Sequence, residues 1–243
     1  GGGEGGVHAR RVAVDFPFLA LLVSGGHCQI LKCLGIGRYE ILGGTIDDSL
    51  GEAFDKVARL LSLPAPNGGG PAVESLAREG NPRAIPLPIP MSQRKDCDFS
   101  YAGLKTSVRS HATKLAARRG LVEIDDLSEQ DKADVAASFQ HVAIRHVEQR
   151  LNRAMDRLVA DGEEMRSLVV VGGVAANQEL RGRLQRLCEE RKEGEWRMFV
   201  PPPRLCTDQG AMSAWAAVER IMVGSSDDPV GHDVFARFPF GEL

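Results

Sequence analysis

The chain has 243 residues, of which 43% are hydrophobic and 26% are charged, an ordinary globular composition that excludes a disordered or fibrous protein. A formal net charge of −3 excludes a global basic field, so a polyanion would have to bind through a local basic patch. Five cysteines, without a Cys-x-x-Cys pair, argue against a disulfide framework and indicate a reducing compartment. No apolar run approaches the roughly 18 residues of a membrane span, so none is expected.

The N-terminal part of the chain predicts a leader followed by antiparallel strands. The glycine-rich residues 1–6 indicate a flexible leader. Residues 16–24 read as a buried strand, residues 28–36 as its hairpin partner, and residues 39–46 as a third strand. The first two strands are separated by a glycine pair within LLVSGGHCQI. That pair indicates either a tight β-turn or a close approach of the backbone to a ligand, and the stretch alone leaves both interpretations open.

Apolar residues at helical spacing follow the third strand. Residues 47–61 predict a helix, with Thr45 and Asp48 as a capping box at its start. Residues 64–71 form a loop rich in helix breakers, after which a short helix begins. Residues 80–100 contain four prolines and are expected to be irregular.

The second half of the chain alternates helices and strands. Helices are expected over residues 103–119, 131–159, 175–192 and 206–222, and strands over residues 167–173 and 196–200. The apolar run SLVVVGG is typical of a strand covered on both faces. Antiparallel strands followed by strand–helix alternation predict an α/β protein.

A second glycine pair ends the strand of VVVGGVAANQEL. Gly172 and Gly173 would let backbone N–H groups face a ligand, and Asn177 would open the next helix. A helix N-terminus with free amides favours phosphate, although the absence of a following GK[ST] excludes a Walker A loop. A strand-to-helix turn that needs a positive φ explains the same residues.

Two acidic residues also allow two interpretations each. Asp208, in CTDQG, is either the N-cap of the last helix or a metal ligand at its mouth. Asp55, in GEAFDK, is either a solvated helix residue or a hydrogen-bond acceptor for a ribose hydroxyl.

Six segments, taken together and in order, resemble one family. They are LLVSGGH, IDDSLGEAFDK, GGGP, DFSYAGLKT, VVVGGVAAN and PPPRLCTDQGAM. This series is similar to the tRNA threonylcarbamoyl-adenosine transferases over residues 16–243. The resemblance implies the actin/sugar-kinase/Hsp70-like (ASKHA) α/β fold, with residues 1–15 as leader and residues 16–243 as a nucleotide-binding lobe with a helical excursion. The family's N-terminal lobe has no counterpart, so the chain is expected to be the C-terminal portion of a two-lobed enzyme.

The same resemblance implies an acyl transfer. The threonylcarbamoyl group of threonylcarbamoyl-AMP would pass to N6 of adenosine 37, beside the tRNA anticodon. The family's substrate-binding positions correspond to Leu22, Val23, Ser24, Gly25, Gly26, Asp55, Gly70, Ser100 and Asn177. The alternatives are a remnant that binds adenylate or a partner subunit without transfer, and a sugar-kinase relative. No segment supplies both the general-base Asp and the hexose-binding residues of the latter.

The resemblance also implies one divalent metal ion, zinc or iron, with Asp208 as a ligand. The family supplies two more ligands from a His-x-x-x-His pair, whereas this chain has only His8, with Glu4 four residues earlier. A carboxylate without two imidazoles binds zinc or iron poorly, which leaves His8 a doubtful ligand and the metal site in doubt.

A basic helix offers a possible contact with tRNA. Its positively charged residues are Lys105, Arg109, Lys114, Arg118 and Arg119. They either follow tRNA phosphates or form a solvated face. The family resemblance further suggests a mitochondrial address, with the bacterial cytoplasm as the alternative, and a homodimer.

Overall fold

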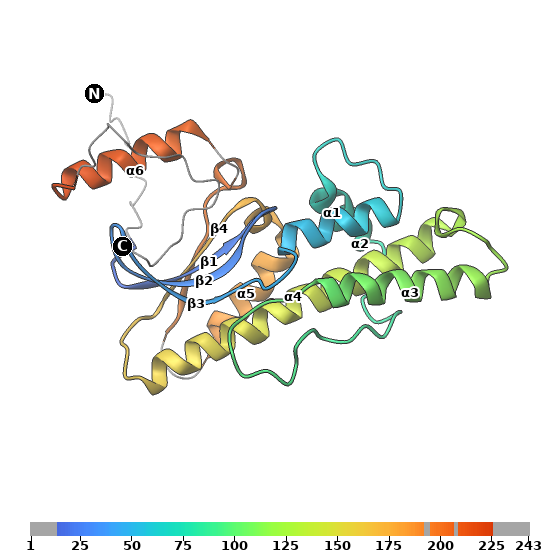
Figure 1. The fold of residues 1–243 in the computed structure, drawn as a ribbon, viewed down its shortest axis with the longest axis horizontal. Helices are drawn as coiled ribbons and strands as arrows, with labels where there is room; N and C mark the ends of the chain where they lie inside the picture. Colours follow the sequence, from blue (N-terminus) through green and yellow to red (C-terminus); the bar gives the residue numbers. More distant parts are fainter. Residues whose placement is uncertain (1–13, 192–194, 207–208, 226–243) are drawn as a thin grey trace, which may run out of the picture.

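The computed structural model describes residues 14–191, 195–206 and 209–225. Within these ranges five strands form one mixed sheet in the order β3-β2-β1-β4-β5 (Figure 1). Their bounds are β1 Phe18–Val23, β2 Cys28–Gly35, β3 Arg38–Gly44, β4 Ser167–Val171 and β5 Arg197–Phe199. The first three strands are antiparallel neighbours, whereas β4 runs parallel to both β1 and β5. The predicted α/β class is confirmed.

Strand β1 lies at the centre of the sheet and fixes its two faces. Leu19, Leu21 and Val23 are fully buried and face the main core, while Ala20 belongs to a smaller cluster on the opposite face. This alternation follows from the period of two along a strand. Leu22 of β1 pairs with Val171 of β4, so the two parallel strands end at the same edge of the sheet.

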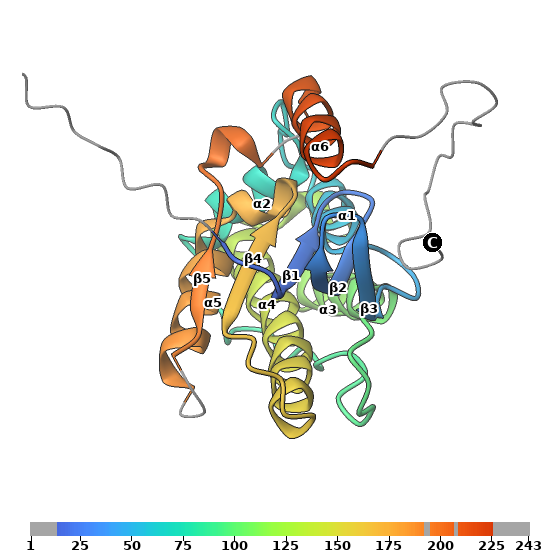
Figure 2. The same cartoon turned by 90° about the vertical axis from the view of Figure 1, so that its left-hand side faces the viewer.

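Six α-helices occur in the described ranges. They are α1 Leu50–Leu60, α2 Gly69–Ala77, α3 Ala102–Arg118, α4 Glu129–Ala160, α5 Gln178–Glu190 and α6 Gly210–Met222. The 32-residue α4 crosses one face of the sheet, and α3 lies beside it (Figures 1 and 2). Phe54 of α1 meets Phe139 of α4 edge to face, with ring centroids 5.0 Å apart. No helix within these ranges is both long and apolar enough to cross a membrane.

Each predicted helix is present, but three begin three or four residues later than predicted, among them α6, which begins at Gly210 rather than at residue 206. Helix α1 begins at Leu50 rather than residue 47, and its cap is Ser49, whose side chain accepts a hydrogen bond from Glu52 N. The capping box assigned to Thr45 is therefore wrong; its hydroxyl donates to the Asp48 carbonyl instead. The helix predicted from residue 175 begins at Gln178, after a single 3₁₀ turn over Gly173–Ala176.

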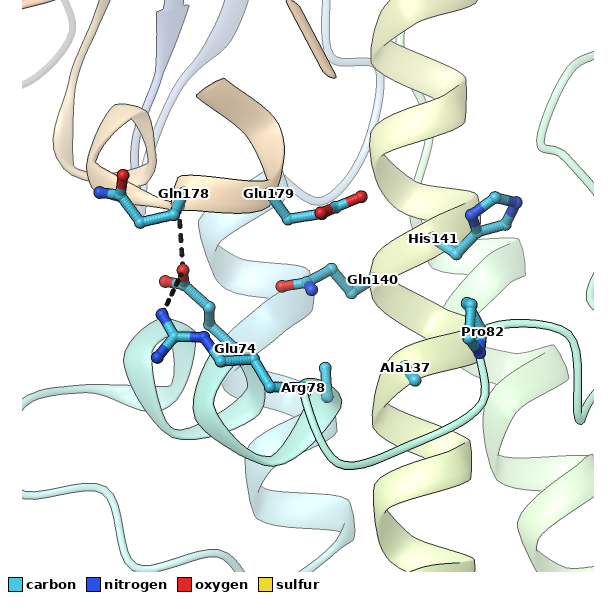
Figure 3. A pocket seen from close by; sticks show the side chains of 9 residues that line it. Glu74, Arg78, Pro82, Ala137, Gln140, His141, Gln178 and Glu179 are labelled. Carbon is cyan, nitrogen blue, oxygen red and sulfur yellow. Dashed lines mark hydrogen bonds and ion pairs between the residues drawn. The ribbon is translucent and has the colours of Figure 1, made fainter. Parts of the chain in front are cut away.

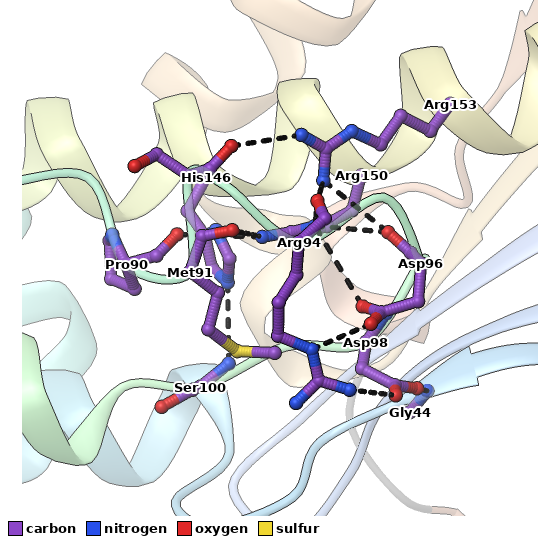
Figure 4. A network of polar contacts seen from close by, with 11 residues as sticks. Gly44, Pro90, Met91, Arg94, Asp96, Asp98, Ser100, His146, Arg150 and Arg153 are labelled. Carbon is purple, nitrogen blue, oxygen red and sulfur yellow. Dashed lines mark hydrogen bonds and ion pairs between the residues drawn. The ribbon is translucent and has the colours of Figure 1, made fainter.

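The irregular segment before α3 is held by two guanidinium groups of α4, the buried Arg150 and its neighbour Arg153. Arg150 of α4 has no exposed surface and donates to the carbonyls of Arg94 and Asp96 at 3.0 and 2.9 Å, and to that of Met91 (Figure 4). Buried backbone carbonyls need such partners when no regular structure supplies them. This clamp determines where residues 90–98 lie, and Ser100 follows directly.

Candidate functional site

The two glycine bends lie next to each other, at the ends of β1 and β4. Gly172 has a φ of +98°, and a Cβ built on it would lie 2.3 Å from the Val23 carbonyl oxygen. Only glycine permits both that conformation and that approach. The bends at Ser24–Gly26 and Gly172–Gly173 therefore lie side by side at one edge of the sheet.

The first bend is held by the hydroxyl of Ser24. Its oxygen accepts from Gly26 N at 3.2 Å and from His27 N at 3.0 Å, while Ser24 N donates to the His27 carbonyl. These two amides are thus already bonded, which the glycine pattern alone did not indicate. A hydroxyl that accepts twice still has its own proton to donate. Among the described residues no partner is found for Gly25 N–H, so this amide and the Ser24 hydroxyl are the donors that the bend offers to a ligand.

The N-terminus of α1 contacts the back of this bend. Gly51 N donates to the Ser24 carbonyl at 3.1 Å, and the Ser49 hydroxyl donates to the Gly25 carbonyl at 2.7 Å. A Cβ on Gly51 would lie 2.6 Å from the Ser24 oxygen, so a glycine is required for this contact. By contrast, a Cβ on Gly25 or Gly26 would meet nothing within 4 Å. Both glycines therefore adjoin open space.

Asp55 connects α1 to the start of α2. Its Oδ1 accepts from Gly69 N at 2.9 Å, so one carboxylate oxygen orders the GGGP loop, while the part of the chain that the structure describes offers no hydrogen-bond donor to the other. Gly70 follows, half-buried, with open space where a side chain would be. The structure thus brings Asp55 of α1 close to Gly70, in the first turn of α2.

Ser100 lies at the start of α3, in contact with an aspartate that the sequence analysis missed. Its hydroxyl donates to Asp47, whose other oxygen accepts from Tyr101 N at 2.8 Å. Ser100 N donates to Nε2 of His146, a fully buried ring. Burial and the nearby Arg150 and Arg153 lower the pKa of His146 to about 3, so this imidazole is neutral and structural.

The next residue, Asp48, forms two ion pairs. Its carboxylate contacts Lys56 of α1 at 2.6 Å and Lys105 of α3 at 3.1 Å. Burial opposes ionisation of this carboxyl, but the two lysines outweigh it and lower its pKa. Asp47, Asp48 and Ser49 are therefore three consecutive residues that tie α3, both lysines and the first bend to one another.

Asn177 is buried, and its side chain is bonded within the protein. Its Oδ1 caps α5 by accepting from Leu180 N at 2.9 Å, and its Nδ2 donates to Gln140 of α4 at 3.0 Å. Capping is the role that this residue type prefers before a helix. A contact between Asn177 and a ligand stays a prediction, and it would require exchange of one of these bonds.

A cavity of about 390 Å³ lies beside this cap, between α2, α4 and α5 (Figure 3). Its polar lining includes Glu74, Arg78, Gln140, His141, Gln178 and Glu179. Glu74 accepts from Gln178 N at 2.9 Å, which fixes α2 against the first turn of α5. Asp55 thus joins α1 to α2, and Glu74 joins α2 to α5, so the helices that follow the two bends are connected by hydrogen bonds.

The residues described do not form a metal site. No group of three His, Cys, Asp or Glu side chains that could hold an ion occurs among them. Asp208 and His8, the two predicted ligands, both lie outside the described residues, as does the predicted leader up to residue 13.

Comparisons with known proteins place the chain in a family. A sequence model of the tRNA N6-adenosine threonylcarbamoyltransferase family matches residues 5–215. A protein of that name from Rhizobium leguminosarum is 48% identical over 227 residues, which cover 92% of this chain and 58% of the relative. One from Agrobacterium fabrum is also 48% identical, covering 93% and 59%. A probable mitochondrial one from Arabidopsis thaliana is 41% identical, covering 94% and 49%.

The mixed sheet, with two glycine bends at neighbouring strand ends, is consistent with part of an ASKHA fold. The chain belongs to the tRNA N6-adenosine threonylcarbamoyltransferase family. It spans between about half and six tenths of the length of these relatives.

Proposed function

We propose that the chain takes part in forming threonylcarbamoyl-adenosine in tRNA, by binding threonylcarbamoyl-AMP for transfer to N6 of adenosine 37. The observation that carries this proposal is that the two glycine bends lie side by side, at the ends of the neighbouring strands β1 and β4. Backbone N–H groups exposed at such bends attract a phosphate. The relatives' shared name supplies the reaction.

The transfer requires mainly that the N6 amine and the carbamoyl carbon be held next to each other. The N6 amine attacks the carbamoyl carbon and forms the new N–C bond, the carbon–oxygen bond to AMP breaks, and AMP leaves with the electron pair while the amine loses a proton. Gly25 N–H and the Ser24 hydroxyl would donate to the phosphate or carbamate oxygens, with Leu22 and Val23 providing the strand that carries them. The second oxygen of Asp55 would accept from a ribose hydroxyl, near Gly70. Fixed donors beside a developing negative charge stabilise it without reorganisation.

Ser100 would contact the threonyl part of the substrate. Its hydroxyl is oriented by Asp47, and three consecutive residues link it to the first bend. This link supports placing the phosphate and the threonyl group within one site. Asn177 would contact the adenylate from the second bend.

The tRNA would lie along α3, which begins two residues after Ser100 and contains no acidic residue. Asp48 pairs with Lys105, and Asp131 pairs with Arg119. Arg109, Lys114 and Arg118 are exposed and have no ion-pair partner among the described residues. Basic side chains free of carboxylates release counterions when they meet phosphates, which favours binding.

The remaining parts of the proposal rest on the family. Its members generally depend on a metal ion, and here Asp208 would be a ligand to zinc or iron. A mitochondrial address rests on the plant relative, with the bacterial cytoplasm as the alternative because the rhizobial relatives are also similar. A homodimer is supported by exposed apolar side chains of α6, among them Trp215 and Ile221.

The experiment is a transfer assay. The chain is incubated with threonylcarbamoyl-AMP and a tRNA that lacks the modification, and the nucleosides are separated after digestion. The proposal predicts threonylcarbamoyl-adenosine in the digest and saturable binding of the adenylate. Binding without product identifies a chain that holds adenylate but does not complete transfer. Absence of both contradicts the proposal.

A further inference from the structure

The peptide bond between Gly25 and Gly26 is held at both ends by serine hydroxyls. Its carbonyl accepts from Ser49 Oγ at 2.7 Å, and its N–H donates to Ser24 Oγ at 3.2 Å. The two serines come from different elements, since Ser24 ends β1 and Ser49 caps α1. Figure 1 shows α1 beginning beside the end of β1.

The orientation of this peptide matters for an anion. A carbonyl oxygen carries partial negative charge and repels phosphate, whereas N–H groups attract it. The carbonyls of Ser24 and Gly25 both point toward α1, where Gly51 N and the Ser49 hydroxyl bond them. The face of the bend away from α1 is therefore left free of these two carbonyl oxygens.

Apart from the bond between Gly26 N and Ser24 Oγ, nothing in the local chain would preserve that orientation. The peptide is flanked by glycine on both sides, and glycine accepts positive and negative φ about equally. Rotation of the Gly25–Gly26 peptide would direct its carbonyl toward the ligand side. The open space around both glycines offers no steric resistance to that rotation.

We propose that Ser49 is a positioning residue, which locks the Gly25–Gly26 peptide with its carbonyl turned away from the phosphate. Its hydroxyl has one proton, which goes to Gly25 O, while its oxygen accepts from Glu52 N at 3.2 Å. The side chain is 2% exposed, so water does not replace it. One hydroxyl thereby couples the start of α1 to the anion-binding bend. The inference rests on the proposed function only for the identity of the ligand.

Capping α1 is a purely structural role for the same side chain, and substitutions separate the two. Ser49→Ala removes both hydrogen bonds. Ser49→Gly removes the donor to Gly25, but glycine is nearly as good an N-cap as serine, so the melting temperature should fall by about 2–4 °C, mostly through the lost bond to Gly25. Ser49→Thr restores a hydroxyl that can make both bonds.

Two measurements are made on each variant: the Kd for AMP, used as the probe, and the amide hydrogen exchange of Gly26 without ligand. If Ser49 holds the Gly25–Gly26 peptide in its binding orientation, Ser49→Gly should weaken AMP binding about tenfold. Loss of one hydrogen bond lowers the fraction of chains in which the peptide has that orientation. The same loss should also give faster exchange of Gly26 N–H. Ser49→Thr should recover both values toward wild type.

The outcomes distinguish this inference from the proposed function. If the wild-type chain binds AMP and Ser49→Gly binds it equally well, the lock is refuted and the binding function stands. If the wild-type chain does not bind AMP, the proposed function fails. In that case the exchange of Gly26 still decides the lock, because unchanged exchange in Ser49→Gly overturns it without any ligand. The Gly comparison does not depend on whether the threonine methyl fits.

Discussion

Substituting alanine for a helix glycine usually stabilises a protein, and the contact between α1 and the first bend predicts the opposite at Gly51. Alanine is favoured over glycine within a helix by up to about 1 kcal/mol. At Gly51, however, the new Cβ would lie 2.6 Å from the Ser24 oxygen and 2.8 Å from Gly25 Cα and N. Ordinary contact begins at 3.4 Å, so the bend must withdraw by roughly 0.8 Å.

Overpacking of this kind costs about 1–3 kcal/mol. Set against the helical gain, the net expectation for Gly51→Ala is a destabilisation of about 1 kcal/mol, which for a chain of this size lowers the melting temperature by about 2–4 °C. Displacement of the bend should also weaken AMP binding at least as much as Ser49→Gly does. Thermal unfolding and equilibrium binding measure the two effects.

Gly182 provides the matched control. It lies within α5, is exposed, and a Cβ built on it would meet nothing within 4 Å. Gly182→Ala should therefore raise the stability by up to about 1 kcal/mol and leave AMP binding unchanged. If Gly51→Ala is as stable as Gly182→Ala and binds AMP normally, α1 does not support the bend and the reasoning is wrong.

Three further predictions follow from other contacts. Arg150→Met removes one of the donors to each of three loop carbonyls and should cost about 3 kcal/mol in unfolding free energy, whereas exposed Arg109→Met should change it little; equal stabilities would disprove the clamp. His146 has a folded pKa of about 3, well below the 6.5 of the unfolded chain, so its contribution to stability is complete above pH 6.5 and is lost as the pH falls toward 3. Between these two pH values the unfolded chain binds up to one proton more than the folded chain, at His146. His146→Leu removes this difference, so its plot of unfolding free energy against pH should be less steep, and parallel plots would contradict this. Replacing Arg109, Lys114 and Arg118 by glutamine should reduce the slope of log K for tRNA against log salt concentration by about 2–3 without lowering the melting temperature; an unchanged slope means that tRNA binds elsewhere.

The strands and helices could be predicted from local patterns because their causes are local. The apolar run over residues 16–24 predicts a buried strand, and β1 confirms it, with Leu19, Leu21 and Val23 fully buried. The start of α1 was predicted at the wrong residue although the correct signal was present. Ser49 and Glu52 stand three apart, as a capping box requires, and glutamate suits the N3 position better than the aspartate paired with Thr45.

The site was only partly predictable, since its polar contacts join residues far apart in sequence. The backbone amide that Asp47 orders lies 54 residues away, at Tyr101, and no pattern within IDDS indicates it. The glycine at 51 looks unfavourable in a helix until the bend is placed against it. Likewise, the glycine pair indicated a close approach of the backbone to a ligand, but the sequence does not show that the Ser24 hydroxyl already accepts from Gly26 N.

The most direct test of the central claim is AMP binding to Gly25→Ala, measured beside its thermal unfolding. A methyl group at Gly25 would touch no protein atom within 4 Å, so the fold should be unaffected and the melting temperature unchanged. The same methyl would occupy the space that the adenylate needs, and the account predicts loss of binding. Wild-type affinity for AMP in this variant would show that the nucleotide does not bind against the first glycine bend.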